Sequence, residues 1–83
     1  MKISVLYRGQ LAQRTGMGSE VLDVQTVRDI LKHVKTKHGG DAEKLARAML
    51  ITVDGESIQL RKGYATKLKE GEIVQFFPIC GGG

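Results

Sequence analysis

Apolar and polar residues alternate near the start of the chain, which predicts two strands joined by a short connection. The alternation runs through residues 2–8 and resumes over residues 20–24. Between them, residues 10–15 favour a short helical turn, and Gly16-Met17-Gly18 is a turn signal. The opening of the chain is therefore expected to be a hairpin of two half-buried strands.

A second group of strand patterns lies in the C-terminal half. Residues 49–53 are expected to form one strand, and Asp54-Gly55 is a dipeptide typical of a type I′ hairpin turn. Residues 56–60 are the expected returning strand. The last strand is predicted over residues 72–77 and ends at Pro78, because proline cannot donate a hydrogen bond to a ladder.

A helical period replaces the alternation between these two groups. Apolar residues recur at spacings of three and four over residues 27–34. Thr26 is a good N-cap, and Asp29 completes a capping box, while residues 37–40 combine basic side chains with glycines that end the helix. A shorter helical segment is expected over residues 41–48.

The order of elements predicts an α+β fold of the β-grasp (ubiquitin-like) type. Because the first and last strands are both apolar, we expect them to pair at the centre of a mixed four- to five-stranded sheet. One main helix would pack across a sheet face. Residues 1–77 would form the domain, and residues 78–83 a flexible C-terminal tail.

Composition narrows the classes of function. A chain of 83 residues with 41% hydrophobic content makes one small domain that is poorly suited to enclose a deep catalytic pocket, which favours a carrier or binding module over an enzyme. The net charge of +4 suits acidic partners, but the four aromatic residues are not clustered among basic ones, so no nucleic-acid partner is expected. The lack of a long apolar run or signal peptide predicts no membrane association and a cytoplasmic location.

The cysteine and the histidines predict no metal site. Cys80 is the single cysteine and cannot form an internal disulfide. His33 lies off the apolar stripe of the helix and His38 lies in its final turn, so both are interpreted as surface or capping residues rather than ligands.

The chain ends in Pro78-Ile79-Cys80-Gly81-Gly82-Gly83, a slim arm whose tip offers an unhindered carboxylate. One hypothesis is that the Gly83 carboxylate is the reactive group, with Gly82 beside it and Gly81 as a spacer. The alternative is a frayed terminus or an expression linker. Phe77, Pro78 and Ile79 are candidates for an exposed apolar neck that docks to partners, although Phe77 could equally pack against the domain itself. Cys80 has a possible thiol role, but the tail holds no basic residue to lower the pKa of that thiol.

Several motifs resemble the ubiquitin-like sulfur-carrier family, the ThiS/MoaD group, across essentially the whole chain. They are Ile3-Ser4-Val5-Leu6-Tyr7, the helix start Thr26-Val27-Arg28-Asp29-Ile30-Leu31, Val53-Asp54-Gly55-Glu56, and the run from Glu70 to Pro78 followed by glycines. Within this group, the length of the chain and its Phe76-Phe77-Pro78 run are most similar to those of the small subunit of molybdopterin synthase. Ile79 stands where that subunit usually has a second proline, and Cys80 with three glycines where it usually has two glycines.

The resemblance implies a chemistry for the tail. A ubiquitin-activating-type adenylating enzyme would use ATP and Mg to adenylate Gly83, and a persulfide enzyme acting as sulfur donor would convert it to a thiocarboxylate. A larger sulfur-accepting synthase subunit would then take the sulfur, most simply for molybdopterin. The chain itself would bind no cofactor and would not be an enzyme. Sulfur transfer for thiamine or cysteine synthesis, conjugation to lysines as a protein modifier, and a binding module with an inert tail remain as alternatives.

Overall fold

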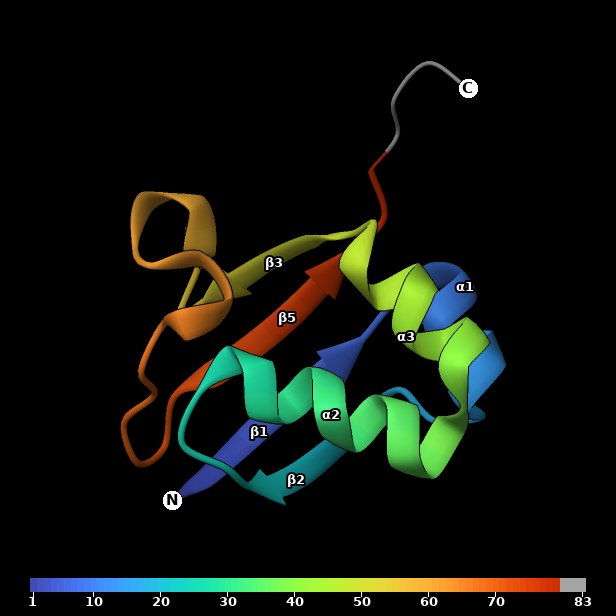
Figure 1. Cartoon of the computed structure of the whole chain (residues 1–83), viewed down its shortest axis with the longest axis horizontal. Helices are drawn as coiled ribbons and strands as arrows, with labels where there is room; N and C mark the ends of the chain where they lie inside the picture. Colours follow the sequence, from blue (N-terminus) through green and yellow to red (C-terminus); the bar gives the residue numbers. More distant parts are fainter. Residues whose placement is uncertain (80–83) are drawn as a thin grey trace.

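The computed structural model describes residues 1–79 and contains one five-stranded mixed sheet of order β2-β1-β5-β3-β4 (Figure 1). In chain order the elements are β1 (Lys2–Tyr7), α1 (Gly9–Thr15), β2 (Ser19–Asp23), α2 (Val27–His38), α3 (Gly40–Arg47), β3 (Leu50–Val53), β4 (Glu56–Ser57), the 3-10 turns η1 (Ile58–Leu60) and η2 (Gly63–Ala65), and β5 (Ile73–Phe77). This arrangement confirms the predicted α+β fold and its strand count.

The first and last strands pair at the centre of the sheet, as the sequence predicts, and they run parallel. Val5 pairs with Val74 and Tyr7 with Phe76, and all four side chains are buried. Both strands carry apolar residues on the face covered by the helices, so their pairing removes this surface from water. At the centre of the sheet, β5 is therefore paired with its neighbours up to its last residue, Phe77.

Helix α2 crosses one face of the sheet, while α1 and α3 pack beside each other at one end (Figure 1). The predicted capping box is present: the Thr26 hydroxyl accepts from the Asp29 N–H at 3.2 Å, and Asp29 Oδ2 accepts from the Thr26 N–H at 3.1 Å. The apolar stripe of α2 is buried from Val27 to Val34. The local signals and the packed face thus agree on where this helix begins and how it lies.

The returning strand is shorter than predicted. The turn before it has positive φ at Asp54 (48°) and Gly55 (86°), as a type I′ hairpin requires. However, β4 ends at Ser57, whose hydroxyl accepts from the Gln59 N–H and starts η1, and Ile58 turns into the core. The predicted strand over residues 56–60 is therefore wrong beyond Ser57, because burial of Ile58 outweighs continued pairing at the sheet edge.

Within residues 1–79, no helix is both long enough and apolar enough to cross a membrane. The longest helix, α2, has 12 residues and carries charged side chains on its outer face.

Candidate functional site

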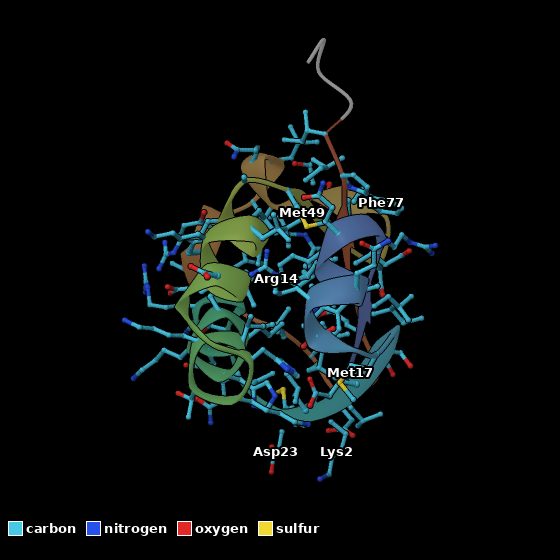
Figure 2. The ribbon with its side chains drawn as sticks, turned by 90° about the vertical axis from the view of Figure 1, so that its right-hand side faces the viewer. Lys2, Arg14, Met17, Asp23, Met49 and Phe77 are labelled. Carbon is cyan, nitrogen blue, oxygen red and sulfur yellow. The ribbon has the colours of Figure 1, made fainter. Side chains whose placement is uncertain are left out.

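The C-terminal end of β5 is the point where the predicted tail leaves the domain. Phe77, the last residue of β5, pairs with Leu50 of β3, and Phe76 pairs with Tyr7 on the other side. Figure 2 shows Phe77 and Met49 at the same end of the molecule. Any chain that follows is therefore attached to a central strand that is paired on both sides.

Phe76 and Phe77 point to opposite faces of the sheet. Phe76 is fully buried, as predicted. Phe77 is half-buried: the Arg8 guanidinium carbon lies 5.1 Å from the centre of its ring, and Arg8 Nη2 donates to Gln75 Oε1 at 2.8 Å. Phe77 thus packs partly against the domain's own surface and is only partly available to a partner.

Pro78 is held in a close contact with Gly9. The backbone of Gly9 has φ +58°, and a Cβ built at this position would lie 3.0 Å from Pro78 Cγ. Glycine is favoured here both by the positive φ and by the space that Pro78 occupies. This contact fixes the direction in which the chain leaves β5.

Ile79 is 64% exposed and lies between two hollows. One, of about 350 Å³, is lined in part by Gly9, Leu45, Met49 and Pro78. The other, of about 240 Å³, is lined in part by Leu50 and Ile51 of β3 and by Tyr64. Of the predicted docking residues, Pro78 and Ile79 line these hollows and Phe77 lines neither. The predicted site residues Cys80, Gly81, Gly82 and Gly83 lie outside the described residues.

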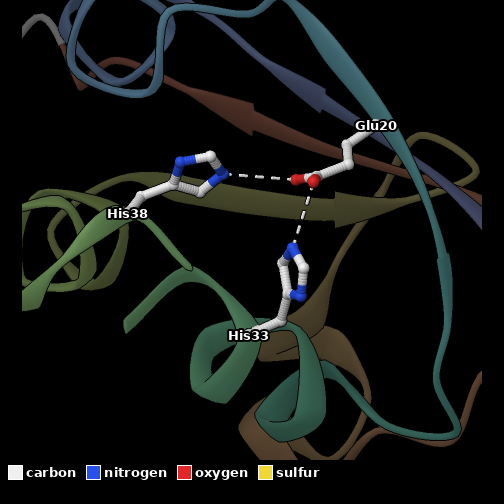
Figure 3. A group of neighbouring side chains, drawn as sticks. All are labelled: Glu20, His33 and His38. Atoms are coloured by element: carbon white, nitrogen blue, oxygen red, sulfur yellow. Dashed lines mark hydrogen bonds and ion pairs between the residues drawn. The ribbon is translucent and has the colours of Figure 1, made fainter. Parts of the chain in front are cut away.

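A second group of polar residues gathers around Glu20 of β2, on the face covered by α2 (Figure 3). The Glu20 side chain is only 8% exposed. Its Oε1 accepts from the Tyr7 hydroxyl at 2.8 Å and lies 3.4 Å from His38 Nε2, while Oε2 lies 3.1 Å from His33 Nε2 and pairs with the Lys37 ammonium. A nearly buried carboxylate is thus surrounded by four side chains that favour negative charge.

These contacts shift two pKa values. Burial alone raises the pKa of Glu20, but contacts with Lys37, Tyr7, His33 and His38 together outweigh it and lower the pKa to about 2. Burial, followed by the hydrogen bond to the negatively charged Glu20, raises the pKa of the Tyr7 hydroxyl well above its ordinary range. Near neutral pH, Glu20 is therefore an anion and Tyr7 a neutral donor to it.

The interpretation of His38 as a surface residue is wrong, and His33 is only partly at the surface. The His38 side chain is 7% exposed and that of His33 is 29% exposed, and both rings face Glu20. The spacing of His33 and His38 along the sequence did not indicate that both rings would face the same carboxylate. One signal was available: Glu20 shares strand parity with the buried Leu22, which places a carboxylate on the inward face of β2.

Comparisons with known proteins agree with the architecture. A sequence model described as the ThiS family matches residues 5–83. No curated protein sequence matches the chain.

Among solved structures, the chain is similar to small archaeal modifier protein 1 from Methanosarcina acetivorans, with a TM-score of 0.85 and 19% identity over 99% of this chain and 96% of that one. It is also similar to a chain of the Amycolatopsis orientalis BexX/CysO complex, with a TM-score of 0.82 and 24% identity over 98% of this chain and 99% of that one. A third similar structure is the putative molybdopterin converting factor, subunit 1, from Pyrococcus furiosus, with a TM-score of 0.75 and 24% identity over 94% of this chain and 97% of that one. At these identities the likenesses establish the shared fold.

Proposed function

The chain belongs to the ThiS family, and on this basis we propose that it is a sulfur carrier whose C-terminal glycine is activated by a partner enzyme. The observation that carries the proposal is the extent of the family match, which runs from the first strand through the glycine tail to Gly83. The predicted reactive group thus belongs to the part of the sequence that the family shares.

The proposed chemistry takes place at the Gly83 carboxylate. An adenylating enzyme with ATP and Mg would join this carboxylate to AMP and release pyrophosphate, because AMP is a far better leaving group than hydroxide. A persulfide sulfur from the donor enzyme would then attack the acyl carbon and expel AMP, and a thiol would cleave the resulting sulfur–sulfur bond to leave a thiocarboxylate. Glycine at positions 82 and 83 leaves the acyl carbon unhindered.

The geometry at the end of β5 suits a carrier that is handed between enzymes. Phe77 is fixed in the sheet and Pro78 against Gly9, so a partner that docks beside Ile79 would receive the tail in a defined direction. Exposed apolar residues beside such an arm are typical of docking surfaces. In this proposal the chain binds no cofactor, and the catalytic groups belong to the adenylating enzyme and to a larger sulfur-accepting subunit.

The acceptor that we propose is the pterin precursor of molybdopterin. The similar structure from Pyrococcus furiosus, described as a putative molybdopterin converting factor subunit, supports this choice. The similarity to a chain of the BexX/CysO complex supports a larger partner, and leaves sulfur transfer toward other products, thiamine and cysteine among them, as alternatives.

A second candidate function is protein modification. The similarity to small archaeal modifier protein 1 favours it, because the same activated glycine could be joined to a lysine of a target protein. Both functions begin with adenylation and differ in the nucleophile that follows.

The test of the proposal is activation of the tail. The full chain, a variant lacking Gly82-Gly83, and Cys80→Ser would each be incubated with a matching adenylating enzyme and ATP, and pyrophosphate release would be measured. We expect release with the full chain and with Cys80→Ser, and none with the truncated chain. Equal pyrophosphate release from all three proteins would contradict the proposal. In cells, conjugates of the full chain to lysines of other proteins, absent with the truncated chain, would favour the protein-modifier function.

A further inference from the structure

Three side chains with metal-binding atoms converge between β2 and α2. Glu20 comes from the strand, and His33 and His38 come from the last two turns of the helix (Figure 3). We propose that Glu20, His33 and His38 form a binding site for a divalent transition-metal ion, with zinc as the best fit. This site goes beyond the proposed carrier function and does not depend on it.

The spacing of the ligand atoms fits tetrahedral coordination. With zinc–nitrogen and zinc–oxygen distances near 2.0–2.2 Å, neighbouring ligand atoms of a tetrahedron lie about 3.4 Å apart. His33 Nε2 lies 3.1 Å from Glu20 Oε2, and His38 Nε2 lies 3.4 Å from the other carboxylate oxygen, Oε1, so each histidine has this spacing to one of the two oxygens. The ligand atoms of all three residues lie within 4.8 Å of one another, so a small convergence of the side chains would complete the arrangement.

An unpartnered nitrogen points to the same conclusion. His33 Nε2 is buried and, among the described residues, makes no hydrogen bond, although it lies close to a carboxylate oxygen. A cation bound between them would satisfy both groups.

The surroundings of the cluster would support the ligands. The Tyr7 hydroxyl donates to Glu20 Oε1 at 2.8 Å, and the Tyr7 ring packs edge-on against the His38 ring at 6.0 Å. Such contacts orient a ligating carboxylate and an imidazole. Two imidazoles and one carboxylate suit zinc and its neighbours rather than magnesium or calcium, and they leave a fourth position open for water.

Lys37 is the group that opposes metal binding. Its ammonium pairs with Glu20 Oε2 and brings a positive charge to the place where the ion would sit. The Lys37 side chain is 49% exposed, so it can move into solvent when the ion binds. Removal of this charge should therefore strengthen binding.

The test uses the full chain carrying Cys80→Ser, since a free thiol can itself bind zinc. Chelator-treated protein would be titrated with Zn²⁺ by calorimetry, and with Co²⁺ to read the coordination from its visible spectrum. We expect one ion per chain and a tetrahedral cobalt spectrum. His33→Gln and His38→Gln should each weaken binding at least about tenfold, whereas Lys37→Gln should tighten it.

A matched control is Glu43→Gln, which removes a half-buried carboxylate held by Arg47 outside the cluster and should leave binding unchanged. The gain expected for Lys37→Gln cannot result from partial unfolding, so it separates a metal site from general damage to the fold. The proposal is overturned if the Cys80→Ser chain binds no ion, if binding survives both histidine substitutions, or if Lys37→Gln weakens binding.

Discussion

Replacement of Glu20 by glutamine should destabilise the metal-free protein near neutral pH and have little effect in strong acid. The Glu20 carboxylate is nearly buried, and its negative charge is favoured by the Lys37 ammonium, the Tyr7 hydroxyl and the two histidines. Glutamine keeps the shape and can still accept from Tyr7, but it removes the charge that these groups favour.

The magnitude follows from the pKa of Glu20. This pKa falls from an ordinary value of 4.5 to about 2 in the folded protein. At about 1.4 kcal/mol for each pH unit, the difference corresponds to about 3 kcal/mol of stability. Because the folded-state pKa is the lower one, this stabilisation is fully present above pH 4.5 and is lost as the pH falls toward 2.

The assay is urea unfolding of the wild-type and Glu20→Gln proteins in the presence of a chelator, over a series of pH values. The difference in the free energy of unfolding should be about 3 kcal/mol near neutral pH and should shrink steadily below about pH 4.5. Glu43→Gln is the control, because its partner Arg47 lies one helical turn away near the surface and such pairs contribute only about 0.5 kcal/mol. A difference for Glu20→Gln that stays constant across the pH series would refute the reasoning.

Three further predictions concern the helix cap and the neck. Thr26→Ala should lower the free energy of unfolding, measured by urea denaturation, by about 1 kcal/mol, because it removes the hydroxyl that caps α2. Thr26→Ser keeps a hydroxyl and should not lower it. Equal losses for the two variants would argue against the capping box. Gly9→Ala should lower the free energy of unfolding by about 1 kcal/mol, because residue 9 has a positive φ and its added Cβ would crowd Pro78. Gly18→Ala is the control and should be neutral, because its added Cβ meets open space. A larger loss for Gly18→Ala than for Gly9→Ala would contradict the close contact between residue 9 and Pro78. Ile79→Asp should leave the unfolding temperature unchanged, since the side chain is largely exposed, but should slow pyrophosphate release by the adenylating enzyme; an unaffected rate would exclude docking at this residue.

Much of the fold could be predicted from the sequence because its signals are local or periodic. The capping box at Thr26, the apolar stripe of α2 and the apolar character of the first and last strands each depend on a few neighbouring residues. The end of β4 could not be predicted in this way, because Ile58 leaves the strand for a place in the core that only the assembled sheet and helices create.

The Glu20 cluster could not be predicted for the same reason. Glu20 and His38 are 18 residues apart in sequence, and their contact depends on how α2 lies across β2. The alternation along β2 could have placed Glu20 on the inward face with Leu22, but it says nothing of which helical residues Glu20 meets. At the neck, the sequence identified Phe77, Pro78 and Ile79, whereas the contacts of Arg8 with Phe77 and of Gly9 with Pro78 required the three-dimensional structure.

The most direct test of the carrier function is the intact mass of the full chain after incubation with a matching adenylating enzyme, ATP, Mg and a persulfide donor. We expect a mass increase equal to the replacement of one oxygen by sulfur, which fragmentation would map to Gly83. An unchanged mass, in a reaction where the same enzymes convert a known carrier, would contradict the proposal that this chain carries sulfur.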